Sequence, residues 1–295
     1  MRLALTIGDL SGKGGRRRRA FDRLMSGLIY GAVVAAIVPL VAIVGEVVIQ
    51  GLPQINWEFL TALPRPPTIP GGGIFNAIEG STIMVGLAAL IAVPLGVGAG
   101  IYFSEWPESR LSFLSSFTND VLAEFPTITL GIFVYLVVVL TTHTFSAIAG
   151  AIALSIVMIP IVARTTEESL KLVPHTLREA SMALGIPRWK TVIRIVISTG
   201  KTGLATGILL SVARAAGETA PLVVTALWSV YPVTNLWGPT GSIPYLIFYY
   251  GLSPYQTWHG YAWGGAFLLV VFMLGLNLSV KLLIGRKFAG IRAEI

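Results

Sequence analysis

Two opposite charges, Arg214 and Glu218, interrupt a long apolar segment of this 295-residue chain. If that segment is a membrane helix starting near Thr202, Arg214 lies about 18 Å along its axis, past the middle of a hydrocarbon core roughly 30 Å thick. An arginine at that depth costs about 2.5–3.5 kcal/mol on insertion scales, and such residues usually have a function. The spacing of four places Glu218 one turn away on the same helical face. The pair therefore predicts a gate for an anionic solute, or else a mutually neutralising pair that fixes the helix to its neighbours.

A second charged group ends an earlier apolar stretch. Glu167 and Glu168 follow Arg164 at spacings of three and four, so both carboxylates can pair with its guanidinium on one helical face. A planar guanidinium also matches a tetrahedral oxyanion better than an ammonium does. We predict that Arg164, with Glu167, faces the cytoplasmic end of the solute path. The alternative is an interfacial arginine whose head group simply reaches water.

The polar block 164–200 lies between the two groups. Its apolar residues have helix-like spacing, and Pro174 and the sequence Gly185-Ile186-Pro187 punctuate it. This pattern predicts short amphipathic helices joined by a tight turn at Gly185, which together offer a surface to a partner. The alternative is an ordinary loop whose positive charge only sets membrane topology.

Metal, cofactor and nucleotide chemistry have no matching pattern. The chain has no cysteine, and its three histidines, His143, His175 and His259, are far apart in the sequence. The sequence Gly200-Lys201-Thr202 matches the end of the phosphate-binding motif Gly-x-x-x-x-Gly-Lys-Ser/Thr. The first glycine of the motif is missing, because Ile195 occupies its position. We therefore predict no metal site, no cofactor and no hydrolysis of ATP by this chain.

The composition indicates the elements that carry these residues. Hydrophobic residues make up 54% of the chain and charged residues 12%, against about 25% charged in soluble domains, and the mean hydropathy is +0.78. Long apolar runs of this kind predict an all-α membrane protein with six transmembrane helices. The predicted spans are residues 24–49, 77–103, 113–140, 146–163, 202–228 and 260–284.

The segments between the spans predict the topology. Residues 1–23 form a mobile basic tail, the Pro/Gly-rich segment 50–75 an external loop that is neither strand nor helix, and residues 285–295 a second tail. Nineteen of the 21 Lys and Arg residues then lie on one side, Arg65 lies on the other, and Arg214 lies within the membrane. This bias places both termini and the 164–200 block in the cytoplasm of a multi-pass cell-membrane protein. The basic tail is a topology signal rather than a nucleic-acid site, and the partner of the spans is membrane lipid.

A motif in the polar block resembles the coupling motif of ABC importer permeases. Glu179-Ala180-Ser181 is followed after three residues by Gly185 and after nine more by Ile195. The motif reads Glu-Ala-Ala, three residues, Gly, nine residues, Ile-x-Leu-Pro, so this sequence departs from it at Ser181 and at Ile197-Ser198. Further stretches are similar to the phosphate-specific permease family, over about residues 76–284. These stretches are Arg164–Leu170, Val173-Pro174, Arg178-Glu179-Ala180 and Ala213–Leu222.

The resemblance implies a fold and a set of partners. It implies a type I importer permease fold over residues 76–284 with a cytoplasmic coupling helix, in which Glu179, Ala180, Ser181 and Gly185 contact an ATPase. It also implies a PstC-like second permease, a PstB-like ATPase dimer and a PstS-like phosphate-binding protein. The expected function is that of a permease subunit of an ATP-driven inorganic phosphate importer, with ATP hydrolysed on another chain.

An ion-coupled secondary transporter for an oxyanion is the alternative function. In such a carrier Arg214 and Glu218 would form a proton relay. The coupling motif favours the importer, because a secondary carrier needs no docking helix, and we find none of the inverted repeats typical of many carriers. A membrane enzyme is a third class, but one Arg with one Glu suits binding or gating better than hydrolysis.

Overall fold

The computed structural model describes the backbone of residues 13–292 and the side chains from Ala20 to Ser279. The elements of this part of the chain are helices and their connections, without a strand. The chain divides into two units, residues 1–49 and 50–295, which are described separately.

Helix α1 (Lys13–Gly51) makes up the first unit almost entirely. The predicted mobile tail 1–23 is therefore wrong from Lys13 onward, because the helix begins eleven residues before the predicted span 24–49. The residues from Lys13 to Arg23 include Lys13, four consecutive arginines and Ala20, which favour a helix, and they contain no proline that would stop one. Residues 1–12 lie outside the described part of the chain.

The predicted loop 50–75 contains two short helices, which corrects its assignment as neither strand nor helix. These are the 3₁₀ turn η2 (Leu52–Gln54) and helix α2 (Trp57–Thr61). Asn56 caps α2 by accepting a hydrogen bond from the backbone N–H of Phe59 at 2.9 Å. The Pro-rich residues that follow are irregular, as predicted.

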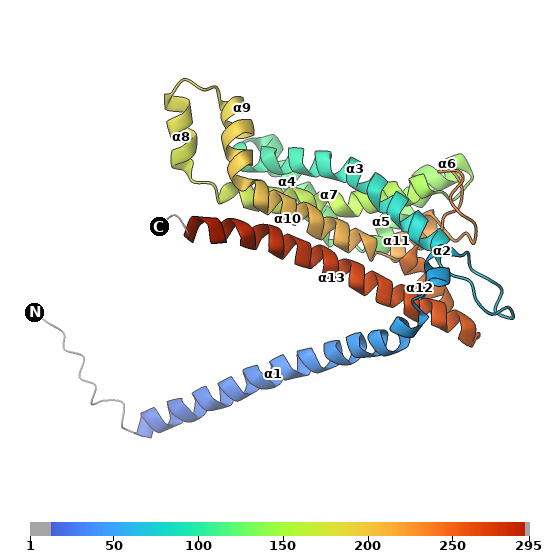
Figure 1. The fold of residues 1–295 in the computed structure, drawn as a ribbon. Helices are drawn as coiled ribbons and strands as arrows, with labels where there is room; N and C mark the ends of the chain where they lie inside the picture. Colours follow the sequence, from blue (N-terminus) through green and yellow to red (C-terminus); the bar gives the residue numbers. More distant parts are fainter. Residues whose placement is uncertain (1–12, 293–295) are drawn as a thin grey trace, which may run out of the picture. The chain divides into compact units, whose positions relative to one another are not determined.

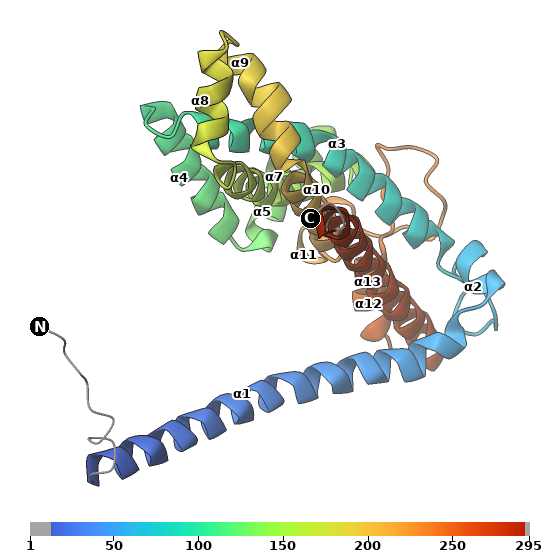
Figure 2. The same ribbon diagram turned by 60° about the vertical axis from the view of Figure 1, so that its left-hand side comes forward.

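Helices α3 (Phe75–Glu105) and α7 (Ala147–Lys171) form the centre of the second unit (Figure 1). Glycines let the two backbones approach closely. If Gly96 carried a Cβ, this atom would lie 2.7 Å from Val162 Cβ, and a Cβ at Gly100 would lie 2.6 Å from Thr166 Cβ, so neither position has room for a side chain. Helix α10 (Ile197–Ala216) packs on α7, with Gly207 facing Thr165. The view in Figure 2 shows α7 and α10 side by side under α3.

A bend divides the predicted span 113–140. Helix α4 (Arg110–Glu124) is followed by α5 (Thr127–Val134), the π-helical turn η3 (Tyr135–Val139) and α6 (Leu140–Thr142), with a bend of 104° at the break. The prediction of one continuous helix is wrong because Pro126 lacks an N–H group and disfavours the helical conformation at Phe125.

The predicted span 202–228 is also broken. Helix α10 ends at Ala216, and helix α11 (Ala220–Thr225) begins four residues later. The two short helices that follow the breaks, α5 and α11, pack together. Gly131 permits this contact, since a Cβ at that position would lie only 2.6 Å from Pro221 Cα. Both interrupted spans therefore place their breaks in one part of the bundle.

The remaining helices lie towards the ends of the second unit. Helices α8 (His175–Ala183) and α9 (Arg188–Thr191), with the π-helical turn η4 (Val192–Val196), form one end (Figure 1). Helix α12 (Ile243–Gly251) packs against α13 (Gln256–Arg292) towards the other end. The predicted tail 285–295 is helical up to Arg292, and residues 293–295 lie outside the described part.

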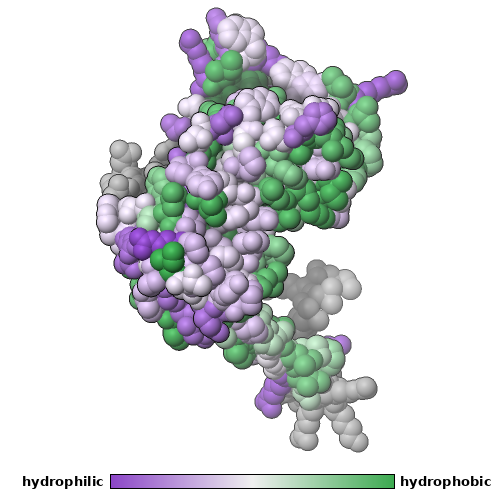
Figure 3. Space-filling model, turned by 90° about the vertical axis from the view of Figure 1, so that its right-hand side faces the viewer, coloured by the Kyte–Doolittle hydropathy of each residue, from purple (hydrophilic) through white to green (hydrophobic). Residues whose placement is uncertain are grey.

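The membrane fold predicted from composition is confirmed. Five described helices are long and apolar enough to span a bilayer, and the bent pair on either side of Pro126 makes a sixth candidate span. Large apolar side chains reach the surface in broad patches (Figure 3), for example Leu90 at 74% exposure and Phe113 at 73%. Such exposure is costly in water and suits lipid or another transmembrane chain.

The close approach of α3 and α7 makes opposite predictions for two neighbouring glycines. Gly100→Ala should destabilise the protein by about 1–3 kcal/mol, because its Cβ would overlap Thr166. Gly98→Ala is the matched control, since its Cβ meets no atom within 4 Å, and it should be neutral or gain up to ~1 kcal/mol of helix propensity. Thermal unfolding in detergent measures both changes, and equal midpoints for the two variants would contradict this packing.

Candidate solute path and coupling surface

The coupling hairpin, residues 175–191, consists of α8, a tight turn and α9. Gly185 has a φ of +78°, a conformation that residues with a side chain rarely adopt. Its N–H donates to Met182 O at 2.9 Å, and the N–H of Ile186 donates to Ser181 O at 3.3 Å. The structure therefore places the predicted turn at Gly185, with hydrogen bonds that close the end of α8.

Ser181, one of the departures from the motif, joins the two arms of the hairpin. Its hydroxyl lies 2.8 Å from that of Thr191, and both side chains are buried. The hydrogen bond connects α8 to α9 across the turn. Sequence reasoning missed Thr191 because the two residues are ten positions apart and meet only when the chain reverses at Gly185.

The outer surface of the hairpin exposes apolar side chains beside Glu179 and Ala180, which are themselves exposed. Leu184 is 81% exposed and Trp189 58%. Solvent-exposed apolar groups at the tip of a polar hairpin indicate a surface that a partner covers. The large apolar residues of this surface are Leu177, Met182, Leu184 and Trp189.

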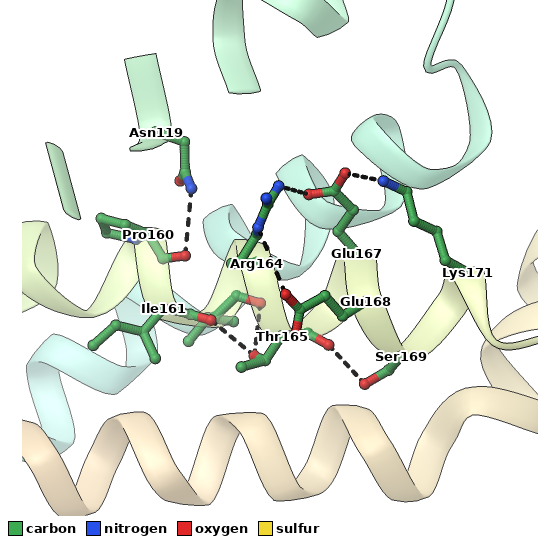
Figure 4. Close-up of polar contacts among 10 residues, drawn as sticks. Asn119, Pro160, Ile161, Arg164, Thr165, Glu167, Glu168, Ser169 and Lys171 are labelled. Carbon is green, nitrogen blue, oxygen red and sulfur yellow. Dashed lines mark hydrogen bonds and ion pairs between the residues drawn. The ribbon is translucent and has the colours of Figure 1, made fainter. Parts of the chain in front are cut away.

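Arg164 makes both predicted ion pairs on α7 (Figure 4). Its Nη1 lies 2.9 Å from Glu167 Oε2, and its Nε lies 3.7 Å from Glu168 Oε1. Lys171 adds a third pair, with Nζ at 2.6 Å from Glu167 Oε1. The Glu167 side chain is 6% exposed and that of Arg164 48%. Two cations thus hold one buried carboxylate, while half of Arg164 stays accessible.

Helix α4 contacts α7 next to this group. Asn119 of α4 is buried, and its Nδ2 donates to Pro160 O at 3.4 Å, a long hydrogen bond (Figure 4). Pro160 lies four residues before Arg164 on α7. The segment that ends in the bend at Pro126 is therefore attached next to the Arg164 group.

Arg214 and Glu218 are paired, although not on one helical face as predicted. Helix α10 ends at Ala216, so Glu218 lies in the break before α11, where its N–H donates to Ala215 O at 3.2 Å. Arg214 Nε and Glu218 Oε1 are 3.7 Å apart, an ion pair that is too long for a hydrogen bond. The prediction of a continuous helix failed here because Pro221, in the first turn of α11, has no N–H to donate to the carbonyl group of Gly217 and its ring crowds that carbonyl group.

The exposure of Arg214 bears on the two interpretations of the pair. Its side chain is 59% exposed, whereas that of Glu218 is 16% exposed. An arginine that fixed α10 to its neighbours within the chain would be covered by them. A guanidinium left open in a helix of membrane-spanning length faces a polar cavity or another chain instead.

The two arginine groups lie at successive levels of the bundle. Because Gly207 of α10 faces Thr165 of the antiparallel α7, Arg164 is level with about residue 208. Arg214 lies six residues further along, about 9 Å at a rise of ~1.5 Å per residue. The structure thus brings each predicted arginine together with its predicted carboxylate, in two steps along neighbouring helices.

The sequence matches known transport proteins over most of its length. The model of the family described as "Binding-protein-dependent transport system inner membrane component" matches residues 92–288. The phosphate transport system permease protein PstA of Yersinia pestis is 39% identical over 92% of each chain. That of Xylella fastidiosa (strain 9a5c) is 43% identical over 81% of this chain and 83% of the relative. The probable PstA of Methanocaldococcus jannaschii is 38% identical over 88% of this chain and 92% of the relative.

Solved structures show the same fold. A chain of the MetNI methionine ABC transporter, in inward facing conformations, aligns with a TM-score of 0.58 and 18% identity. The alignment covers 72% of this chain and 94% of that chain. The predicted type I ABC importer permease fold is confirmed by this likeness together with the family match.

The hydrogen bond inside the hairpin predicts a double-mutant result. Ser181→Ala or Thr191→Val alone should destabilise the protein by about 1–3 kcal/mol, because each leaves the other hydroxyl buried without its partner. The double variant should be less destabilised than the sum of the two single variants. Thermal unfolding in detergent gives all four values, and simple additivity would show that the hydroxyls do not interact.

Proposed function

Because the chain belongs to the binding-protein-dependent transport system inner membrane components, and within them to the PstA permease proteins, we propose that it is a transmembrane subunit of an ATP-driven importer of inorganic phosphate. The observation that carries a path for an anion is Arg214, a guanidinium that is 59% exposed at the end of a membrane-length helix. The identity of the substrate, phosphate, is inferred from the phosphate transport permeases to which this chain is similar.

The Arg214–Glu218 pair acts as the gate. With the path closed, Glu218 neutralises Arg214; an arriving phosphate competes for the guanidinium, which offers it charge-assisted hydrogen bonds. Glu218 then repels the anion, so that phosphate is not trapped at the site. The position of Glu218 in the break between α10 and α11 supports this role, because a residue outside a helix changes its distance to Arg214 with little backbone rearrangement.

Arg164 provides the next site along the path. It lies about 9 Å further towards the coupling hairpin, and its side chain is 48% exposed. Lys171 shares Glu167 with Arg164, and Glu168 also pairs with Arg164, so the two cations and the two carboxylates of the group balance. Glu168, which is 68% exposed, neutralises Arg164 until an anion replaces it, as Glu218 does for Arg214.

The coupling hairpin provides the connection to ATP. We propose that Glu179, Ala180, Ser181 and Gly185 belong to a docking surface for a PstB-like ATPase dimer, which binds and hydrolyses ATP in place of this chain. A PstC-like permease completes the path, and a PstS-like protein delivers phosphate from outside. The bias of basic residues supports a topology in which both termini and the hairpin are cytoplasmic.

The alternative, an ion-coupled secondary transporter, would also use Arg214 and Glu218. The family match favours the importer, since it describes transport that depends on a binding protein. The exposed apolar tip of the hairpin favours it as well, because a carrier that works alone has no partner to cover that surface.

The gate predicts different results for its two residues. Arg214→Gln should lower phosphate uptake by a factor of about 10 to 100, corresponding to the ~1.5–3 kcal/mol of a charged hydrogen bond. Glu218→Gln should change basal ATP hydrolysis without unfolding the protein. Uptake of labelled phosphate by the complete transporter in proteoliposomes is the measurement. The gate is wrong if both single variants are unstable and the double variant recovers both folding and uptake.

The hairpin predicts a loss of ATPase binding. Glu179→Lys and Gly185→Trp should lower recovery of a co-expressed ATPase about tenfold, because each places a mismatched group on a surface that must fit its partner. Glu179→Gln keeps the shape of the side chain and should have a smaller effect. Co-purification measures recovery, and membrane insertion of each variant is the control. Unchanged recovery together with unchanged uptake would exclude this docking surface.

A further inference from the structure

A buried ion pair connects the coupling hairpin to α3. Arg178 of α8 donates to Glu105 Oε1 through Nε at 3.1 Å and through Nη2 at 2.8 Å. The side chains are 11% and 4% exposed, so both charges are largely removed from water. Removing one partner of such a pair is strongly destabilising, because the other charge stays buried without compensation.

The same arginine also holds the end of α7. Its guanidinium donates to Leu170 O at 3.0 Å and to Val173 O at 2.6 Å, in the last turn of α7 and just beyond it. A cation is favourable there, because the last carbonyl groups of a helix lack intrahelical donors and carry partial negative charge. Arg178 thus joins α8 to both α3 and α7.

The other arm of the hairpin is attached at the same point. Arg188 of α9 donates to the backbone carbonyl of Glu105, and its guanidinium lies 4.9 Å from the ring centroid of Trp106. A cation over an indole ring is attracted by the negative face of the ring. Both arms of the hairpin therefore contact the last residue of α3 or the residue after it.

The covalent connections of the hairpin are less suited to transmit movement. Pro174 separates α8 from α7, and the π-helical turn η4 separates α9 from α10. Proline and π-helical turns are the usual places where helices bend. A displacement of the hairpin would be absorbed at these two points unless a third connection holds it to the bundle.

The far end of α3 holds another segment in a similar way. Glu79 Oε2 accepts a hydrogen bond from Val233 N at 2.9 Å, and Ser81 Oγ accepts one from Ile243 N at 2.8 Å. Asn76 donates to Ser229 O. Helix α3 has 31 residues, about 46 Å at a rise of ~1.5 Å per residue. It contains Pro94, and its close packing on α7 at Gly96 and Gly100 supports it next to that residue. One helix thus connects the hairpin to segment 229–243 at the opposite end of the bundle.

We propose that Glu105 is a positioning residue for transport, which fixes the coupling hairpin to α3 so that α3 carries the movement of the hairpin across the membrane to segment 229–243. This inference rests on the proposed function, because it needs an ATPase that moves the hairpin. Glu105 contacts neither phosphate nor ATP in this scheme. It acts through Arg178 and α3.

Transport by the complete complex tests the coupling. Glu105→Gln removes the charge from a side chain of the same shape, and it should lower the phosphate imported per ATP hydrolysed about fivefold or more, a typical coupling factor, while the ATPase still co-purifies. Arg178→Lys keeps the charge but loses the planar fork that reaches three acceptors, and it should act in the same direction. Glu108→Gln is the matched control, because it removes an exposed carboxylate three residues away.

Spin labels test the rigid connection itself. The chain has no cysteine, so Glu108→Cys and Ala183→Cys, both at exposed positions, selectively label the turn that follows α3 and the last residue of α8. The distance distribution between the labels should stay narrow and unchanged when ATP binds, and it should broaden with Glu105→Gln.

Three results decide the proposal. Unchanged phosphate per ATP and an unchanged distance distribution in both Glu105→Gln and Arg178→Lys would overturn it. If Glu105→Gln does not fold, Arg178→Lys decides alone by the same two measurements. Failure of the unmodified chain to recover any ATPase would instead contradict the proposed function, before a variant is compared.

Discussion

The cost of placing a charge among apolar groups decides where this protein can carry ionisable side chains. An isolated ion loses several kcal/mol of solvation in such surroundings, and an opposite charge in good geometry offsets the loss. Glu167 lies between Arg164 and Lys171, Glu105 accepts two hydrogen bonds from Arg178, and Glu218 lies beside Arg214. The pairs differ in exposure, and this difference separates their roles. The closed Glu105–Arg178 pair suits a rigid connection, whereas the open Arg214 and Arg164 suit exchange of one anion for another.

Two backbone interruptions break the membrane spans of this chain. One span turns by 104° at Pro126, and α10 ends at Ala216, two residues before Glu218. The short helices after these breaks, α5 and α11, pack together, so the two irregular segments support each other. In a bilayer, non-helical backbone is tolerated where protein or a water-filled cavity surrounds it. The breaks therefore belong to the interior of an assembly, as a solute path requires.

Local spacing explains which features the sequence could predict. Arg164 and Glu167 are three residues apart on one helix, and Gly185 needs a backbone conformation that glycine adopts freely, so both follow from the chain itself. Glu105 and Arg178 are 73 positions apart and Ser181 meets Thr191 only across a turn, so their contacts depend on tertiary packing. The breaks at Pro126 and Gly217 were missed for another reason. Apolar composition is the same on both sides of them, and a hydropathy pattern marks the length of an apolar stretch rather than its direction.

In the proposed function, ATP rather than an ion gradient drives phosphate through a path that contains this chain. The direct measurement is phosphate accumulation in proteoliposomes that hold the complete transporter, with ionophores added to collapse proton and sodium gradients. We expect uptake that requires ATP and the binding protein and that persists when the gradients are abolished. Uptake that disappears with the gradients and does not depend on ATP would contradict this mechanism and indicate a secondary transporter.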